Sequence, residues 1–479
     1  MAGTFVRGFS SVAETGSVEV PVRGSLPDWL SGVLLRNGPG CFEAGRQRLR
    51  HWFDGFSLLH RFALRQGKVS YSSRFLHSTG YLKARQTGQL GYREFATDPC
   101  GSIFGRLFSS FRPQYSHNAN GNIACLEGRF WALAETPLPV EFHPQTLETL
   151  GGVAFADRLG GHLSTTHPHF DYQRQELINY AVQMGSRSAY LVYRLPAGAS
   201  QRQLVAALPT SQPAYMHSFA LTSRHIILAE FPFVVQPASL PFSGRPFIEN
   251  YRWEPGLGTR FTVLRRQDGT VAARLKGEPF FAFHHLNAYE SGDEIFLDVC
   301  AYPDTSILGD FYLERLRAPG GGNITRSEVR RYHLPLRGGE VRAELLCGQP
   351  LEFPCIHYRL RNGLTYRYAY GVGLRGQPAD FYNELVKLDV QARAVKTWYE
   401  EDCYPGEPVF VPAPGARGDD DGVVLSVVFN GLRKTSFLLV LDGTAFYELA
   451  RAELPVPVPF GFHGHFYGEE SLASGGPEP

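Results

Sequence analysis

The sequence has little that would indicate a disulfide framework, a zinc module or a membrane-spanning helix. Its seven cysteines are scattered, odd in number and include no Cys-x-x-Cys pair, which disfavours both disulfides and a short-range zinc site. No apolar run approaches the roughly 20 residues of a spanning helix. Residues 1–10 contain one arginine and no apolar core, so we expect no secretory signal there. These absences predict a protein of a reducing, cytoplasmic compartment.

Net charge is also nearly absent. The chain has 47 Lys and Arg against 46 Asp and Glu, a formal charge of +1. No overall field would attract a polyanion, so we expect no nucleic-acid partner. With 43% hydrophobic and 19% charged residues, the composition is not that of a disordered chain. The 51 glycines, 33 prolines and 13% aromatic residues indicate a turn-rich globular protein.

The segments that can be interpreted are short, rich in β-branched and aromatic residues, and bounded by turn residues. Examples are residues 129–135, 189–194, 225–230, 294–302 and 365–370. Asn430-Gly431 separates two further runs, which is typical of a hairpin. Helical periodicity is visible only around residues 99–111. Many short strands predict an all-β sandwich, barrel or propeller. The sequence contains no Trp-Asp or kelch repeat, so a propeller would have irregular blades.

No low-complexity linker or change in composition divides the chain. We therefore expect one domain over residues 1–470. The last residues, 471–479, have the composition of a flexible C-terminal tail.

Four of the sixteen histidines stand among apolar or aromatic neighbours near the end of a predicted strand. They are His167, His217, His284 and His463. For any one of them alone, a hydrogen-bonded core histidine is the simpler interpretation, and their spacings match no short-range zinc pattern. Histidines from distant strands could still converge on a propeller axis, because the inner strand of every blade ends there. Neutral imidazoles suit Fe(II), Zn(II) and Cu(II) about equally.

Three glutamates lie in apolar or proline-rich settings, where an unpaired carboxylate would be costly. They are Glu135, Glu352 and Glu407. A metal-binding histidine usually donates its other ring N–H to a carboxylate or a carbonyl, which is one role for these side chains. An arginine partner, or simple exposure at a strand end, is the alternative for each.

These residues and their neighbours resemble the carotenoid cleavage oxygenase family over nearly the whole chain. Residues 35–40 (LRNGPG) and 51–55 (HWFDG) are similar to its opening signatures. The four histidine settings resemble its iron-ligand motifs, and the three glutamate settings resemble the motifs that orient those ligands. Residues 93–108 and 420–428 are most similar to the animal branch, which contains the β-carotene oxygenases and the retinoid isomerase of the retinal pigment epithelium.

The resemblance implies a seven-bladed β-propeller with loops and short helices forming a cap over an Fe(II) centre. The four histidines would hold the iron and would be the catalytic residues. Each glutamate would orient one of them: Glu135 with His217, Glu352 with His284, and Glu407 with His463. His167 would have no carboxylate partner. The neighbouring His169, His285 and His465 would be structural.

The implied reaction adds both atoms of O2 across one conjugated C=C bond of a carotenoid or apocarotenoid and gives aldehydes. Central cleavage of β-carotene to retinal is the first candidate. Retinoid isomerohydrolysis uses the same iron ligands and stays an alternative. Stilbene cleavage is disfavoured, because that branch tends to carry lysine where this chain has Ala134. A non-enzymatic propeller that binds carotenoid or lipid is the remaining alternative.

One position departs from the family pattern. Gly121 lies fourteen residues before Glu135, where relatives often carry threonine or valine facing the iron. Glycine there would leave the sixth coordination position less screened. A shifted local alignment is the alternative explanation.

A polyene substrate dissolves in membranes, so the entrance to its tunnel should touch one. Residues 103–111 have the character of an interfacial amphipathic segment, and residues 231–242 are a second candidate. For both segments, burial in the fold is the alternative. Cys100 stands where an animal relative carries a lipidated cysteine, although a lone cysteine there is weak support. We therefore expect a peripherally membrane-associated cytoplasmic enzyme.

Overall fold

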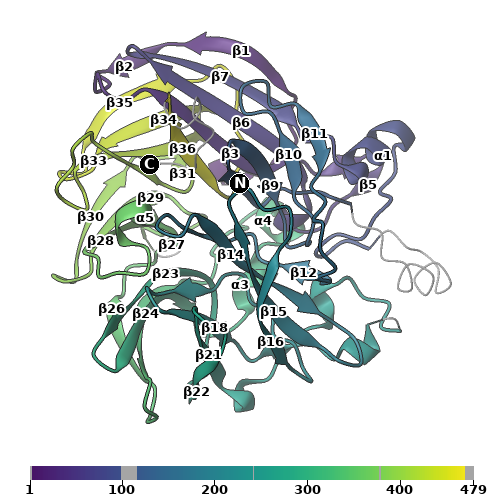
Figure 1. Cartoon of the computed structure of the whole chain (residues 1–479). Coiled ribbons are helices and arrows are strands. Elements are labelled where there is room, and N and C mark those ends of the chain that lie inside the picture. The colour runs from purple at the N-terminus through teal and green to yellow at the C-terminus, as the bar shows by residue number, and fades with distance from the viewer. Residues whose placement is uncertain (1–2, 99–115, 241, 377–378, 470–479) are drawn as a thin grey trace.

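Seven antiparallel sheets surround a common axis in the computed structural model, which describes residues 3–98, 116–240, 242–376 and 379–469 (Figure 1). We number these sheets as blades along the chain. Blade 1 contains β1 (Thr15–Val20), β7 (Lys68–Phe75), β6 (Phe56–Arg65), β3 (Gly32–Cys41) and β36 (Gly464–Gly468). Blade 2 contains β8 (Asn122–Leu126), β9 (Arg129–Leu133), β10 (Val140–Phe142) and β11 (Thr149–Gly152).

Blades 3, 4 and 5 follow in chain order. Blade 3 contains β12 (Leu163–Ser164), β13 (His169–Asp171), β14 (Glu176–Gln183), β15 (Ala189–Pro196) and β16 (Gln203–Pro209). Blade 4 contains β17 (Ala220–Leu221), β18 (His225–Glu230), β21 (Thr259–Arg265) and β22 (Val271–Gly277). Blade 5 contains β23 (Phe281–Ser291), β24 (Glu294–Tyr302), β25 (Glu328–Pro335) and β26 (Arg342–Cys347).

The last two blades complete the ring. Blade 6 contains β27 (Glu352–Cys355), β28 (Tyr368–Gly373), β29 (Glu384–Asp389) and β30 (Ala394–Tyr399). Blade 7 contains β31 (Cys403–Pro405), β32 (Val409–Pro412), β33 (Gly422–Asn430), β34 (Thr435–Asp442), β35 (Glu448–Glu453) and β2 (Val22–Gly24). Two small two-stranded sheets are β4 (Glu43–Ala44) with β5 (Gln47–Arg48) and β19 (Phe233–Val234) with β20 (Arg252–Trp253). The predicted seven-bladed propeller is confirmed.

Strands from both ends of the chain close the propeller. The C-terminal β36 pairs with β3 in blade 1, where Leu34 lies opposite Phe466. The N-terminal β2 pairs with β35 in blade 7, where Val22 lies opposite Ala452. Because the two pairings join adjacent blades in opposite directions, they hold the ring shut. A buried apolar cluster built from both blades, including Leu34, Phe62, Leu425 and Leu438, fills the space between them.

Short helices connect the blades and supply the cap. They are η1 (Thr4–Phe9), η2 (Trp52–Asp54), α1 (Thr79–Thr87), η3 (Pro237–Ser239), η4 (Ile248–Asn250), η5 (Pro255–Leu257), α3 (Ser306–Asp310), α4 (Leu313–Arg317) and α5 (Tyr358–Arg361). Trp52 is central to this layer: its ring packs edge-on against Phe9 and Phe311, and its indole N–H donates to Phe460 O. Among the described residues, no helix has the length and apolar character needed to cross a membrane.

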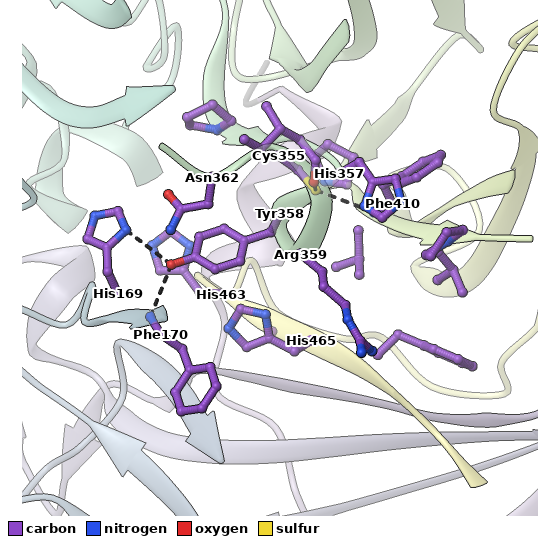
Figure 2. A pocket seen from close by; sticks show the side chains of 18 of the residues that line it. His169, Phe170, Cys355, His357, Tyr358, Arg359, Asn362, Phe410, His463 and His465 are labelled. Atoms are coloured by element: carbon purple, nitrogen blue, oxygen red, sulfur yellow. Dashed lines mark hydrogen bonds between the residues drawn. The ribbon is translucent and has the colours of Figure 1, made fainter. Parts of the chain in front are cut away.

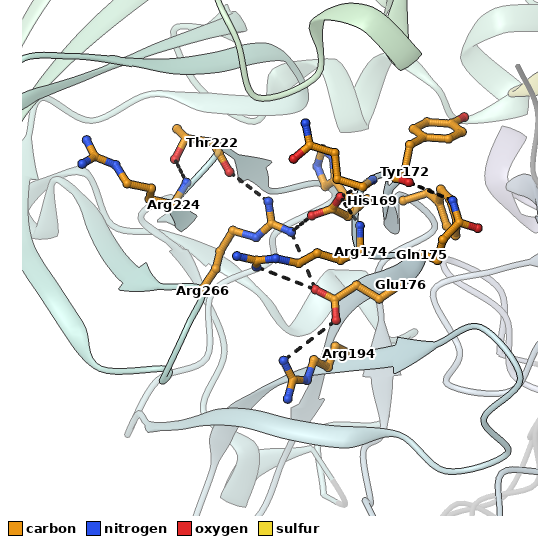
Figure 3. Close-up of polar contacts among 12 residues, drawn as sticks. His169, Tyr172, Arg174, Gln175, Glu176, Arg194, Thr222, Arg224 and Arg266 are labelled. Carbon is orange, nitrogen blue, oxygen red and sulfur yellow. Dashed lines mark hydrogen bonds and ion pairs between the residues drawn. The ribbon is translucent and has the colours of Figure 1, made fainter.

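A buried charge network joins blades 3 and 4 (Figure 3). The guanidinium of Arg266, just after β21, forms an ion pair with Asp171 at the end of β13 and lies 3.7 Å from Glu176 in β14. It also donates to Thr222 O at 3.2 Å. Arg194 from β15 approaches the other side of Glu176 at 3.9 Å. A buried ion pair is costly to break from one side, so this network fixes the position of β13 against blade 4.

Candidate metal centre

Four imidazoles meet where the inner ends of blades 1, 3, 4 and 5 converge. His167 precedes β13, His217 precedes β17, His284 lies in β23 and His463 precedes β36. Their candidate ligand atoms all lie within 4.8 Å of one another. The Nε2 atoms of His167 and His217 are 3.1 Å apart, and those of His284 and His463 are 3.3 Å apart. Two nitrogens bound at about 2.1 Å from one ion, at right angles, would lie about 3 Å apart. The donor set therefore fits a single metal ion.

Three of the imidazoles are oriented by carboxylates. Their Nδ1 atoms lie 2.7 Å from Glu135 Oε1, 2.5 Å from Glu352 Oε2 and 2.6 Å from Glu407 Oε1, for His217, His284 and His463 respectively. An ionised carboxylate only accepts hydrogen bonds, so each Nδ1 carries the proton and each Nε2 keeps its lone pair for the centre. These are the same three pairs that the resemblance implies.

The fourth imidazole has a different environment. Within the described residues, no hydrogen bond joins His167 to a carboxylate. Its backbone N–H donates instead to Thr165 Oγ1 at 3.0 Å, and that hydroxyl donates to the carbonyl of His217. Burial, together with the nearby His463, lowers the pKa of His167 well below its ordinary value. Burial likewise lowers the pKa of His463, so both rings are neutral at pH 7.

The glutamates are themselves held by partners that sequence reasoning did not identify. Arg36 Nη1 donates to Glu407 Oε2 at 2.9 Å, and the backbone N–H of Gly464 donates to the same oxygen at 3.0 Å. Tyr215 donates to Glu135 Oε1 at 2.6 Å. Burial raises the pKa of Glu407, and the positive charge of Arg36 opposes that rise. Arg36 belongs to the LRNGPG segment, so the family signature contained a signal for this role.

Three aromatic rings pack against the imidazole cluster. Phe53 lies nearly parallel to the His217 ring, with ring centroids 6.3 Å apart, and Phe283 packs edge-on against it at 5.4 Å. Phe353 lies 5.3 Å from the rings of both His284 and His463. We call Phe53, Phe283 and Phe353 the aromatic wall. Apolar rings of this kind exclude water and stack against flat hydrophobic molecules.

A cavity of about 1030 Å³ also reaches the cluster, and its walls combine apolar side chains with several polar ones. His167, His284 and His463 line it, together with His169, His285, His465 and Tyr358. Figure 2 shows the hydrogen bond between Tyr358 and His169, whose Oη and Nδ1 atoms are 3.0 Å apart. His285 Nδ1 is 2.7 Å from Ser218 Oγ. His169 and His285 therefore have local hydrogen-bond partners, and both of them and His465 stand outside the group of four.

Gly121 is placed beside the cluster, because its carbonyl accepts a hydrogen bond from the backbone N–H of His463 at 3.3 Å. The space next to it is not open. A Cβ atom on Gly121 would lie 2.6 Å from Thr166 Cγ2. The side chain of Thr166, from blade 3, occupies the place that a side chain at position 121 would take.

Of the two segments considered for membrane contact, the structure describes only the second, apart from residue 241. Residues 103–111 and Cys100 lie outside the described residues. Within residues 231–242, Phe231, Val234 and Val235 are buried in the apolar core. Their interpretation as a membrane-facing run is therefore wrong, since an apolar run at the end of a strand is equally suited to packing inside a blade. Phe242, by contrast, is 80% exposed.

Comparisons with known proteins place the chain in a family. Residues 9–468 match the family described as retinal pigment epithelial membrane protein. A mitochondrial carotenoid-cleaving dioxygenase of Mustela putorius furo is 34% identical over 95% of each chain. The human beta,beta-carotene 15,15'-dioxygenase is 33% identical over 94% of this chain and 92% of its own length. A carotenoid isomerooxygenase of Galleria mellonella is 33% identical over 94% of each chain.

Solved structures show the same fold. An apocarotenoid oxygenase variant from Synechocystis superposes with a TM-score of 0.86 over 97% of this chain and 98% of its own, at 24% identity. A cobalt-substituted form of that Synechocystis enzyme superposes with a TM-score of 0.85. The family match over nearly the whole chain and the shared propeller lead to one conclusion: this chain belongs to the carotenoid cleavage oxygenase family, together with the retinal pigment epithelial membrane protein.

Proposed function

We propose that this chain is an Fe(II)-dependent dioxygenase that cleaves a conjugated C=C bond of a carotenoid or apocarotenoid and releases aldehydes. The observation that carries the proposal is the convergence of four imidazoles, three of them oriented by glutamates, against an aromatic wall. The names of the relatives support the reaction class, because they are dioxygenases and an isomerooxygenase that act on carotenoids.

Charge balance supports a divalent ion at the centre. Glu135, Glu352 and Glu407 place three carboxylates behind the imidazoles, and Arg36 is the only Lys or Arg among the described residues that forms an ion pair with them. Two negative charges remain, and burying uncompensated charge is costly. A dication held by neutral imidazoles removes this imbalance. Zinc has no redox chemistry, so the dioxygenase names of the relatives favour iron.

His167, His217, His284 and His463 would hold the iron, which when bound supplies the chemistry that activates O2. Side chains of the protein would orient the ligands, align the substrate and exclude water. Glu135, Glu352 and Glu407 fix the tautomer of their partners, so that every Nε2 faces the centre. The aromatic wall would align a long, flat polyene and keep water from the reacting bond. We assign no acid or base to this reaction, because neither product requires a proton from the protein.

The identity of the bond that is cut is a finer proposal. Central cleavage of β-carotene to retinal is the first candidate, supported by the human relative's name. The Galleria relative is named a carotenoid isomerooxygenase, which keeps isomerisation as the second candidate. Ala134, directly before Glu135, offers no ammonium group to hold a phenolate, which argues against stilbene cleavage.

Product analysis under ¹⁸O2 tests the proposal. The chain would be loaded with Fe(II) without oxygen and then given β-carotene, apocarotenals, a retinyl ester or resveratrol under ¹⁸O2. We expect two aldehydes from one carotenoid, each with one labelled oxygen. Retinol released by hydrolysis of the retinyl ester would instead indicate the isomerohydrolase. Intact substrate from a fully iron-loaded chain would contradict the oxygenase and indicate a carotenoid-binding propeller.

We also propose peripheral contact with a membrane, which would deliver the apolar substrate. The exposed ring of Phe242 supports this contact. Flotation with phosphatidylcholine vesicles, comparing the natural chain with Phe242→Ser, tests it, and equal flotation would remove Phe242 from the contact. A cytoplasmic location stays a prediction; the names of the Mustela and human carotenoid-cleaving dioxygenases place those relatives in mitochondria.

A further inference from the structure

Thr166, next to the ligand candidate His167, has a hydroxyl with no hydrogen-bond partner among the described residues. Thr166 is 2% exposed, and its Oγ1 atom is buried without a hydrogen bond to any described residue. The adjacent Thr165 differs, because its hydroxyl both accepts from the backbone of His167 and donates to the carbonyl of His217. A buried hydroxyl without a partner costs free energy, so such a group usually bonds to a water, an ion or a ligand.

The position of Thr166 narrows the choice of partner. It directly precedes His167 and packs against Gly121, whose carbonyl accepts from the backbone of His463. The rings of His167 and His463 are the closest pair in the cluster, with centroids 4.4 Å apart. Asn122 Nδ2 donates to Thr166 O at 2.9 Å and so fixes the Thr166 backbone at this point. Thr166 therefore belongs to the immediate surroundings of two candidate ligands.

Gly121 makes room for this side chain. A Cβ atom there would lie 2.6 Å from Thr166 Cγ2 and 3.1 Å from Leu133 O, whereas carbon atoms in contact are normally about 3.5–4.0 Å apart. Glycine at position 121 therefore has a steric reason, and the pair is complementary in size. The side chain that stands at this edge of the centre comes from blade 3 and ends in a hydroxyl.

We propose that the Thr166 hydroxyl donates a hydrogen bond to the small molecule that occupies a coordination position left open by the four imidazoles. This inference rests on the proposed iron site. Thr166 is then a positioning residue: it retains and orients the small molecule, while Gly121 supplies the space for its methyl group. Four nitrogen donors leave up to two positions of a six-coordinate ion, and the buried Thr166 hydroxyl forms no hydrogen bond with any described residue.

Nitric oxide is a suitable probe, because it binds ferrous iron and is seen by electron paramagnetic resonance without turnover. Thr166→Val removes the hydroxyl and keeps the branched shape, and Thr166→Ser keeps the hydroxyl. At equal iron content, we expect Thr166→Val to bind nitric oxide about tenfold more weakly, the loss of one hydrogen bond to a polar ligand. Its iron–nitrosyl spectrum should also change. Thr166→Ser should resemble the natural chain in both measurements.

The metal-free proteins give an independent readout. If the hydroxyl has no protein partner, Thr166→Val should unfold at the same or a higher temperature than the natural chain. Unchanged nitric oxide affinity and spectrum in Thr166→Val, at equal iron content, would overturn the inference and leave the iron site standing. A natural chain that binds no iron would overturn the proposed function, and this inference with it.

The size match between Gly121 and Thr166 can be tested separately from the hydrogen bond. Gly121→Ala should lower the unfolding temperature, because the new methyl group meets Thr166 Cγ2. Adding Thr166→Ser removes that methyl contact and should recover most of the loss. If the two substitutions instead destabilise additively, then Gly121 and Thr166 are not a size-matched pair.

Discussion

The inner end of blade 3 differs from the inner ends of blades 4, 5 and 1, although each supplies one imidazole. Three histidines have a glutamate behind them, whereas among the described residues His167 has no carboxylate partner and its backbone N–H bonds to Thr165 of its own segment. Carboxylates strengthen a histidine ligand and fix its orientation. A fourth carboxylate would add a negative charge that neither Arg36 nor a bound dication compensates. Three glutamates, one arginine and one dication are neutral together, so the asymmetry follows from electrostatics.

The comparison also shows two ways to hold a ring in place. Glu135, Glu352 and Glu407 hold their histidines by strong hydrogen bonds across blade boundaries. His167 depends on the position of the chain just before β13, and β13 is held against blade 4 by Arg266. Substitutions in these two supports should therefore have different consequences. They should change metal affinity in one case and the stability of the fold in the other.

The largest effect is expected for His284→Ala. This change removes a ligand whose basicity Glu352 raises, so iron and activity should be lost together. Iron per chain by mass spectrometry and aldehyde yield would be measured on the same sample. His285→Ala is the matched control, since His285 lies next in the chain but outside the group of four, and it should retain iron.

His167→Ala tests whether a carboxylate partner strengthens a histidine ligand. Without a carboxylate behind it, this ring is the weaker donor, so its removal should reduce iron affinity less than His284→Ala does. Equal losses would show that the glutamates orient the rings without strengthening them. A His284→Ala chain with full turnover would exclude that residue from the site.

Arg266→Met tests the support of blade 3. Asp171 and Glu176 would lose a buried partner, and breaking a buried ion pair from one side costs about 3–5 kcal/mol. Urea denaturation should show that loss of unfolding free energy. Arg194→Met is the control, because its side chain is 40% exposed and 3.9 Å from Glu176; we expect about 1 kcal/mol or less. Similar losses in both variants would contradict a special role for Arg266.

Glu352→Gln tests the carboxylate support. The amide keeps the shape but removes the charge, so iron affinity should fall about 10- to 100-fold, as measured by competition with a chelator. The metal-free variant should be at least as stable as the metal-free natural chain, because one uncompensated negative charge is gone. Glu340→Gln, at an exposed position, should change neither quantity. A metal-free Glu352→Gln chain that is strongly destabilised would contradict the charge-balance argument.

Thr165→Val is expected to have the smallest effect. It removes the hydroxyl that links the backbone of His167 to the carbonyl of His217. We expect about 1 kcal/mol of lost stability, as for a typical hydrogen bond, and a modest fall in iron affinity. Thr165→Ser keeps the hydroxyl and should behave as the natural chain. If Thr165→Val lost as much iron as Glu352→Gln, the two kinds of support would be equivalent.

Local patterns in the sequence predicted the strands well. Residues 225–230 and 294–302 coincide with β18 and β24, and Asn430-Gly431 begins the turn between β33 and β34. The strand predicted at 365–370 begins instead at Tyr368, because the loop after α5 extends further. The run 231–235 was misassigned because an apolar run looks the same whether it faces a membrane or a blade interior. The sequence does not show which surface an apolar run faces.

The sequence by itself determined the strands, their turns and, through resemblance, the residues of the centre. Hydrophobic alternation, turn chemistry and family motifs each depend on residues that are close together in the chain. Only the tertiary structure decided which groups touch. Arg36 and Glu407 are 371 residues apart, and His284 and His463 are 179 apart. Such contacts exist because β36 and β2 close the ring and bring the blade ends to one axis. The fit of Thr166 against Gly121 joins two neighbouring blades, 2 and 3, whose inner ends meet near the same axis.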